Sequence, residues 1–182
     1  CFKMRFWNIG AEGQITAGAI AARLLCNLGI SCMAYTRSIG PIEIQSFDRE
    51  CIGTNPLYMP DADAAEKAAH YLDACRKEQD SSGGMIECVI DGVPAGIGDP
   101  VFEKLDALLA KAMFSIGAVK GFELGNGFSV AHAKGSENND SFYMTEDNAV
   151  GKRTNHAGGI LGGISDGSPI VFRVAVKPTP SI

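Results

Sequence analysis

The chain has 182 residues, of which 46% are hydrophobic and 20% are charged. This length and composition are those of an ordinary globular domain that can bury a core. The formal net charge of -5 argues against a general nucleic-acid binder, because such proteins carry a surplus of Lys and Arg. The apolar runs are too short to cross a bilayer, so no membrane partner is expected.

The six cysteines form no C-x-x-C pair, and the three histidines are not spaced with them as zinc ligands would be. We therefore predict no metal site. We expect reduced thiols, several of them filling a core, as in a cytoplasmic protein. No secretory signal is visible, and the chain begins at Cys1 rather than at Met. We interpret residues 1–182 as a single domain that is a fragment of a longer chain.

The first predicted element is a helix over 11–29, where apolar residues recur at helical spacing and Gly29 is a natural stop. A strand follows over 30–40. Residues 51–63, which include two prolines and a glycine, are typical of a loop.

A second helix is predicted over 61–80, with Asp61 as its cap and further acids in its first turn. Its expected buried stripe consists of Ala65, Ala68, Leu72 and Cys75. His70 lies off this stripe and is expected on the surface. Residues 83–98 then predict a strand followed by a glycine-rich turn.

The sequence over 98–117 has the pattern of a third helix. Asp99 is the expected cap, and Pro100 suits the first helical position. The expected buried face consists of Phe102, Leu105, Leu109 and Ala112.

Three further elements complete the chain. Residues 118–133 predict a strand or hairpin with a turn at Gly125, residues 134–159 a long polar loop, and residues 169–178 a last strand. The mixture of strands and helices predicts an α/β or α+β domain.

The last strand presents two different faces, because successive side chains alternate. Ile170, Phe172, Val174 and Val176 suit a core, whereas Val171, Arg173, Ala175 and Lys177 make a face with two cations. This face leads into "KPTPSI", where Lys, Thr and Ser lie on a turn stiffened by two prolines. Such a turn suits a phosphate group, although a polar strand exit is the simpler interpretation.

The stretch "GGILGGISDGSPI", residues 158–170, contains two glycine pairs but matches neither common phosphate-loop motif. It is either a plain turn or a backbone that a ligand approaches closely. Asn155 and His156 lie beside it, and without a partner carboxylate His156 is more simply a loop histidine. Glu137 and Asp140 are interpreted as solvated charges in a polar loop.

Long stretches of the chain resemble chorismate synthase. The signature is "RTNHAGGILGGISDGSPIVFRVAVKPTPSI", and upstream segments such as "GGMIECVIDGVPAGIGDPVFEKLDALLAKAMFSIGAVKG" fit the family in order and spacing. The resemblance implies a β-α-β sandwich of antiparallel sheets with packed helices, assembled as a homotetramer. It implies conversion of 5-enolpyruvylshikimate 3-phosphate to chorismate by 1,4-anti elimination of phosphate, with reduced FMN as cofactor. In some members NADPH is the reductant.

The resemblance also implies which residues contact the flavin. Lys177, Pro178, Thr179, Pro180 and Ser181 would hold FMN, chiefly its phosphate, while Gly162 would lie next to the flavin. Gly117 and Ala118 match a flavin-contacting turn, where the contact is made through the backbone.

The sequence departs from the family in ways that concern catalysis. The segment "RFWNIGA", residues 5–11, lacks the hydroxyls and second arginine of the family's Arg-Ser-Ser-Ala-Arg-Glu-Thr stretch. The two catalytic histidines and the Gly-Arg-His-Asp-Pro motif of the family are not in these 182 residues, and His132 and His156 do not match them. We therefore assign no catalytic residue and expect the isolated chain to be inactive. A diverged relative acting as a binding or assembly module, and an unrelated phosphate-ligand binder, are the alternatives.

Overall fold

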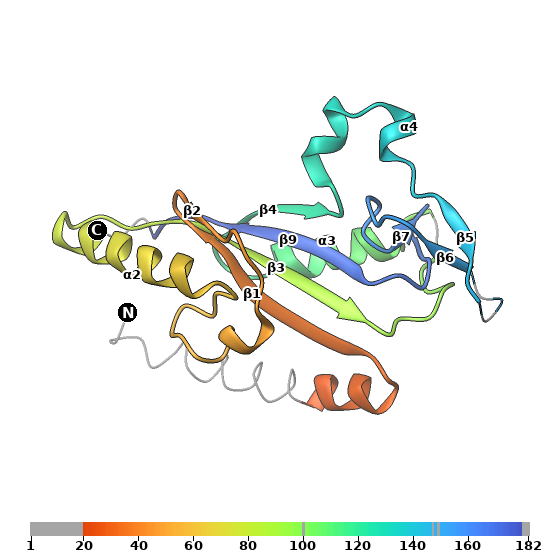
Figure 1. Cartoon of the computed structure of the whole chain (residues 1–182), viewed down its shortest axis with the longest axis horizontal. Coiled ribbons are helices and arrows are strands. Elements are labelled where there is room, and N and C mark those ends of the chain that lie inside the picture. Colours follow the sequence, from red (N-terminus) through yellow and green to blue (C-terminus); the bar gives the residue numbers. More distant parts are fainter. Residues whose placement is uncertain (1–19, 100, 147, 149, 180–182) are drawn as a thin grey trace.

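The structure is a computed structural model that describes residues 20–99, 101–146, 148 and 150–179. Its centre is a five-stranded antiparallel sheet with the order β2-β1-β3-β9-β4 (Figure 1). The strands are β1 (Ser31–Ile39), β2 (Ile42–Glu43), β3 (Gly84–Asp91), β4 (Val119–Leu124) and β9 (Ile170–Val176). The last strand in chain order, β9, therefore lies between β3 and β4. The mixed α/β class, with antiparallel sheets and packed helices, is confirmed.

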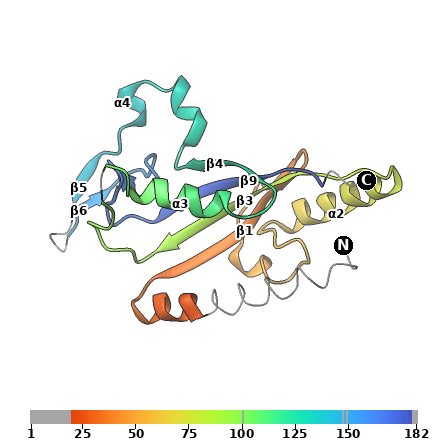
Figure 2. The same cartoon turned by 180° about the vertical axis from the view of Figure 1, so that it is seen from behind.

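The helices lie around this sheet. Seen from behind in Figure 2, α3 (Leu105–Phe114) lies over β9 and β3, and α2 (Ala62–Lys77) lies near the opposite end of the sheet. Residues 20–27 are also helical, as predicted, and the earlier part of that predicted helix lies outside the described residues. No helix in the described ranges is long and apolar enough to span a membrane.

The main core confirms the predicted inward face of β9. Ile170, Phe172 and Val174 are buried there, and the Phe172 ring lies 5.4 Å from that of Phe122 on β4. The helix α3 packs onto these side chains with Leu105, Leu109 and Met113, which share one helical stripe. The core thus fixes α3 along β9, and the two ends of this helix become reference points for the site.

A second, smaller core lies under α2 and confirms the predicted cap of that helix. Met59, Ala64, Ala65 and Ala68 are buried, and Ile39 and Ile42 pack against them. The Asp61 carboxylate accepts hydrogen bonds from the backbone N–H groups of Ala64 (3.0 Å), Gln45 (2.8 Å) and Ser46 (3.0 Å). These bonds begin the helix and attach the preceding loop to it.

Part of the inner face of the sheet is not covered by the described residues. A groove of about 460 Å³ lies between the helical segment 20–27 and α3. Apolar side chains line it, among them Leu25, Leu28, Ile30 and Ile97. Of the described cysteines, only Cys75 is buried; all five, at positions 26, 32, 51, 75 and 88, are free thiols.

The predicted start of the third helix is wrong. The helix begins at Leu105 instead of after Asp99, and Phe102 is 89% exposed. The reason is that Asp99 N donates to Glu103 O (3.1 Å) in an isolated bridge, while Leu105 N donates to Gly163 O (2.8 Å). The first residue of the helix is therefore set by a hydrogen bond to a loop that is distant in the sequence. Ala112, expected in the core, is exposed, and Pro100 lies outside the described residues.

The predicted polar loop over 134–159 also contains regular structure. It holds the short helix α4 (Gly135–Asn138) and a hairpin of β5 (Phe142–Met144) and β6 (Val150–Lys152). The strand β4 does not continue into a hairpin, because residues from Gly127 to His132 form the 3₁₀ helix η2. A second short 3₁₀ helix, η1, spans Arg49–Cys51. The glycine stretch forms the small hairpin β7 (Ile160–Leu161) and β8 (Ile164–Ser165).

Candidate functional site

The residues expected to contact flavin fall into two groups at opposite ends of α3. Gly117 and Ala118 follow the C-terminal end of this helix, and Gly162 lies in the β7–β8 turn at its N-terminal end. The helix has 10 residues, so at 1.5 Å per residue its ends are about 15 Å apart. The two groups are therefore separate contact regions.

The first region joins two segments that are distant in the sequence. Lys177 N donates a hydrogen bond to Ala118 O at 2.9 Å, so the end of β9 lies beside the turn before β4. Ser81 Oγ donates to Thr179 O at 2.8 Å and fixes the other side of the segment. Thr179 is exposed there, and the Lys177 ammonium has Pro178 O within 3.3 Å. Pro180 and Ser181 lie outside the described residues.

The turn before β4 carries backbone strain at an unexpected residue. Ala118 has a φ of 71°, in the left-handed region that side chains other than glycine rarely occupy. Gly117, directly before it, does not have a positive φ. The glycine of this pair is therefore not what permits the turn. The strained residue is the one whose carbonyl holds Lys177, and strain of this kind is typical of functional sites.

The glycines of the second region differ in what an added side chain would meet. A Cβ on Gly158 would lie 2.4 Å from Gly125 N, one on Gly159 would lie 2.5 Å from Pro169 O, and one on Gly163 would lie 2.5 Å from Lys104 Cγ. The packing of the chain itself excludes side chains at these three positions. Gly162 has a φ of 60°, but a Cβ there would meet nothing within 4 Å. The chain thus leaves open space at Gly162.

The predicted cationic face of β9 is not available to a ligand at Arg173. The Arg173 Nε lies 2.9 Å from Glu123 Oε1 and 3.7 Å from Glu87 Oε2, and its Nη2 donates to Gly125 O. Tyr35 OH also donates to Glu87, and burial together with this bond raises the pKa of Tyr35. These side chains join neighbouring strands, and the two carboxylates pair with the charge of Arg173. Lys177 remains the one cation of this face, among the described residues, that lies at the proposed site.

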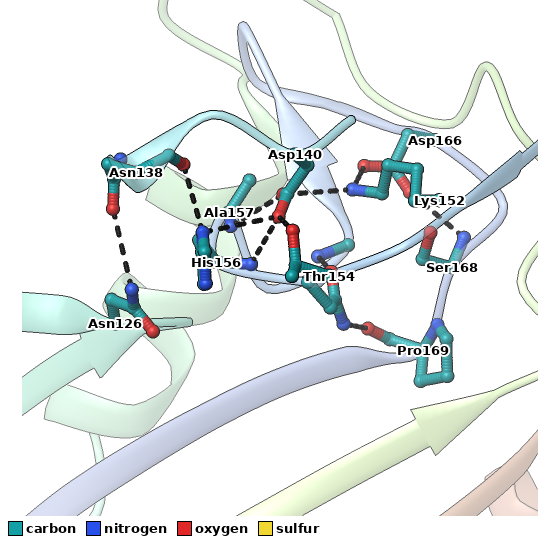
Figure 3. Close-up of polar contacts among 12 residues, drawn as sticks. Asn126, Asn138, Asp140, Lys152, Thr154, His156, Ala157, Asp166, Ser168 and Pro169 are labelled. Atoms are coloured by element: carbon teal, nitrogen blue, oxygen red, sulfur yellow. Dashed lines mark hydrogen bonds and ion pairs between the residues drawn. The ribbon is translucent and has the colours of Figure 1, made fainter. Parts of the chain in front are cut away.

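The expectation that Asp140 is a solvated charge is wrong. Its side chain is 3% exposed and lies in the polar cluster of Figure 3. Its carboxylate accepts hydrogen bonds from Thr154 Oγ1 (2.7 Å), His156 N (2.7 Å), Ala157 N (3.0 Å) and Lys152 Nζ (3.3 Å). Burial by itself raises the pKa of Asp140, but these hydrogen bonds outweigh it and lower the pKa below its usual range.

Lys152 and Asp166 complete this cluster, and neither was singled out from the sequence. The Lys152 ammonium, on a side chain that is 5% exposed, lies 2.6 Å from Asp166 Oδ2. Burial raises the pKa of Asp166, whereas the bonds from Lys152 and Ser168 lower it, with a net lowering. No local pattern could have shown this cluster, because its members come from a hairpin and two loops.

His156 contributes its backbone to this cluster more than its ring. Its Nδ1 lies 3.2 Å from Asn138 O, so the N–H must be on Nδ1 to donate to that carbonyl. The same nitrogen lies 3.6 Å from Asp140 Oδ1. These contacts orient the ring within the loop, and Asp140 is a carboxylate near His156 that the sequence did not reveal. His132 lies at the exposed end of η2.

Comparison with known proteins identifies the family. The sequence profile of the family described as chorismate synthase matches residues 11–182. A chorismate synthase from Agathobacter rectalis is 62% identical over 172 residues, and one from Methanosarcina mazei is 51% identical over 174 residues. Each match covers 93% of this chain and 47% of the relative.

A crystal structure of a chorismate synthase has the same fold. It matches with a TM-score of 0.86 and 31% sequence identity, over 93% of this chain and 55% of that one. The chain thus spans about half the length of the curated relatives it matches. Because the profile and the relatives match most of its residues, this chain belongs to the chorismate synthase family.

Proposed function

We propose that this chain forms the central part of a chorismate synthase and supplies much of its FMN site. The whole enzyme would convert 5-enolpyruvylshikimate 3-phosphate to chorismate and phosphate by 1,4-anti elimination, as a homotetramer in the cytoplasm. Membership of the family supports the lyase class and the place in aromatic biosynthesis. The alternative of an unrelated phosphate-ligand binder is wrong, because the family is shown.

The observation that carries the site proposal is the hydrogen bond from Lys177 N to Ala118 O. It joins two segments, distant in the sequence, that the family resemblance assigns independently to the flavin. The residues present fit FMN: a cation and a hydroxyl lie at one end of α3, and backbone facing open space lies at the other. A cofactor with a ring at one end and a phosphate at the other suits two separate contact regions.

Reduced FMN, when bound, supplies transient electron density as the substrate loses phosphate. The residues of this chain would bind and orient it. Lys177 and Thr179 would hold the cofactor phosphate by charge-assisted hydrogen bonds. The strained backbone at Ala118 would fix a polar contact, and Gly162 would leave room for a planar ring.

A titration of the chain with FMN, followed by flavin fluorescence, tests this proposal. Lys177→Ala should weaken FMN binding at least tenfold, because it removes the cation at the phosphate end. Lys67→Ala is the matched control, since Lys67 is an exposed lysine on α2 and its loss changes the net charge equally. An unchanged flavin signal at high protein concentration, or equal losses in the two variants, would overturn the assignment.

We also propose that this chain alone does not complete the elimination, because the catalytic histidines of the family are not in its sequence. Mixed with 5-enolpyruvylshikimate 3-phosphate and reduced FMN, it should form no chorismate, measured by absorbance and chromatography. Turnover would refute this statement. The second candidate, a diverged binding or assembly module, rests on the segment 5–11, which lies outside the described residues. Sequencing the gene upstream of Cys1 tests it, since an open frame that encodes the two histidines would exclude it.

A further inference from the structure

The buried cluster of Asp140, Lys152 and Asp166 has no role in the proposed contacts with FMN. Its ammonium lies between two carboxylates, 3.3 Å from Asp140 and 2.6 Å from Asp166. The side chains are 5%, 3% and 10% exposed for Lys152, Asp140 and Asp166 respectively. A charged group buried this far is retained only when its partners satisfy it, so the geometry of the three side chains is mutually determined.

Each carboxylate also accepts hydrogen bonds from the backbone on one side of the β7–β8 hairpin, which carries the turn at Gly162 and Gly163. On the entry side, Asp140 accepts from the N–H groups of His156 and Ala157, directly before Gly158. On the exit side, Asp166 accepts from Ser168 N at 2.9 Å. Figure 3 shows the two carboxylates on either side of the Lys152 ammonium. Lys152 is therefore the link between the two sides.

The hairpin that carries Gly162 lies between these two attachments. The backbone of Asp166 reaches back to it, because Asp166 N donates to Gly159 O at 3.0 Å. On its other side, Ser165 Oγ donates to Pro94 O at 2.6 Å and accepts from Ile97 N at 2.8 Å. A Cβ at Gly162 would meet nothing within 4 Å. The next residue is attached to α3, because Gly163 O accepts from Leu105 N at 2.8 Å. The place of Gly162 thus depends on how the residues around it are attached.

We propose that Lys152 is a positioning residue, which sets the place of Gly162 by joining Asp140 to Asp166 across the turn. This inference rests on the proposed function, since Gly162 is there the contact of the flavin ring. Without the ammonium, the two buried carboxylates lose their shared partner and repel each other. The sheet core is built from β9, β4 and α3 together with the buried Ile160 of β7, so the turn is expected to loosen around this one anchored side chain while the sheet persists.

Two variants test the role of the link. Lys152→Met keeps an unbranched side chain one atom shorter and removes its charge. The double variant Lys152→Met with Asp166→Asn also removes the repulsion between the carboxylates, and it is used if the single variant does not fold. Lys67→Met on α2 is the control.

The first measurement is hydrogen exchange without flavin. The amides of residues 159–163 should exchange at least tenfold faster in the Lys152 variants, whereas those of Phe172 and Val174 in β9 should not change. A purely global loss of stability would speed both sets alike. Unchanged exchange at the turn, or equal acceleration in β9, would overturn the inference.

The second measurement is the FMN titration with visible circular dichroism of the bound flavin. Lys152→Met should raise the Kd at least tenfold and change the flavin dichroism, because the ring contact moves. A folded variant with a Kd within twofold of the parent would overturn the role toward flavin. If the parent chain itself binds no FMN, the proposed function fails, and the exchange measurement still decides whether Lys152 positions the turn.

Discussion

The glycines at 162 and 163 offer a sharp test, because they are neighbours in one turn and differ in what surrounds them. Both have a positive φ, 60° and 88°, so an alanine at either position must adopt the left-handed conformation. That conformation costs a residue with a Cβ about 1–2 kcal/mol. Backbone strain alone therefore predicts a similar loss of stability for Gly162→Ala and Gly163→Ala.

Packing separates the two variants. At Gly163 the added Cβ would lie 2.5 Å from Lys104 Cγ and 2.6 Å from Lys104 Cβ, far inside the normal contact distance of about 3.5–4 Å. The near end of a side chain cannot rotate away freely, and overpacking of this kind costs about 1–3 kcal/mol more. We expect a total loss of about 2–5 kcal/mol for Gly163→Ala against about 1–2 kcal/mol for Gly162→Ala.

Thermal unfolding followed by circular dichroism measures this difference. For a domain of this size about 1 kcal/mol corresponds to 2–4 °C, so Gly162→Ala should lower the Tm by about 2–8 °C and Gly163→Ala by about 4–20 °C. FMN binding should show the opposite preference. Gly162→Leu, which places a large side chain in the open space, should weaken FMN binding much more than it lowers the Tm.

The reasoning fails if the two alanine variants lose equal stability, or if the variant at 162 loses more. In that case the contact between Gly163 and Lys104 does not limit the turn. Retained FMN affinity in Gly162→Leu would show instead that the glycine is needed only for the bend of the chain.

Three further predictions concern stability. Hydrogen bonds from the backbone of Ala64 and of residues 45 and 46 lower the pKa of Asp61 to about 2. The contribution of Asp61 to the free energy of unfolding is therefore complete above the unfolded-state pKa of about 3.9 and is lost as the pH falls toward 2. Asp61→Ala should cost about 0.5–2 kcal/mol near neutral pH and remove that part of the acid sensitivity in urea titrations. Ala118→Gly relieves the left-handed strain and should leave the free energy of unfolding within about 1 kcal/mol of the parent, so a larger loss would mean that the methyl group packs. Phe172→Ala should cost about 3–5 kcal/mol, because the ring is 4% exposed and packs on Phe122, and a Tm within 2 °C of the parent would contradict the assigned core.

Local patterns predicted the elements whose environment is local. The alternation in β9 gave its inward face, and the side chain of Asp61 gave the first residue of α2, because both depend on neighbours in the sequence. The start of α3 was predicted too early, since the apparent cap at Asp99 is displaced by the bond from Leu105 N to Gly163 O. Helix boundaries that depend on a distant carbonyl cannot be read from the helix itself.

The candidate site likewise has features that the sequence predicts and features that depend on distant contacts. The family resemblance named Ala118 and Lys177, and the structure adds the bond between them. The sequence could not show that Asp140 is buried, because the spacing of Asp140 from Glu137 indicates only a polar surface. The partner that buries Asp140 is Lys152, on a hairpin that the polar composition concealed. Burial of charge is a property of the assembled chain.

The position of β9 in the sheet determines when this region can fold during synthesis. The strand is last in chain order but pairs with both β3 and β4, so it alone connects the two halves of the sheet. A nascent chain that has not yet exposed residue 176 holds a β1–β3 ribbon and a detached β4 with unpaired edges, which are prone to pair with other chains. The sheet of this region is therefore complete only after β9 has been synthesised. A nonsense codon between Leu124 and Ile170 should yield aggregated product instead of a shortened domain.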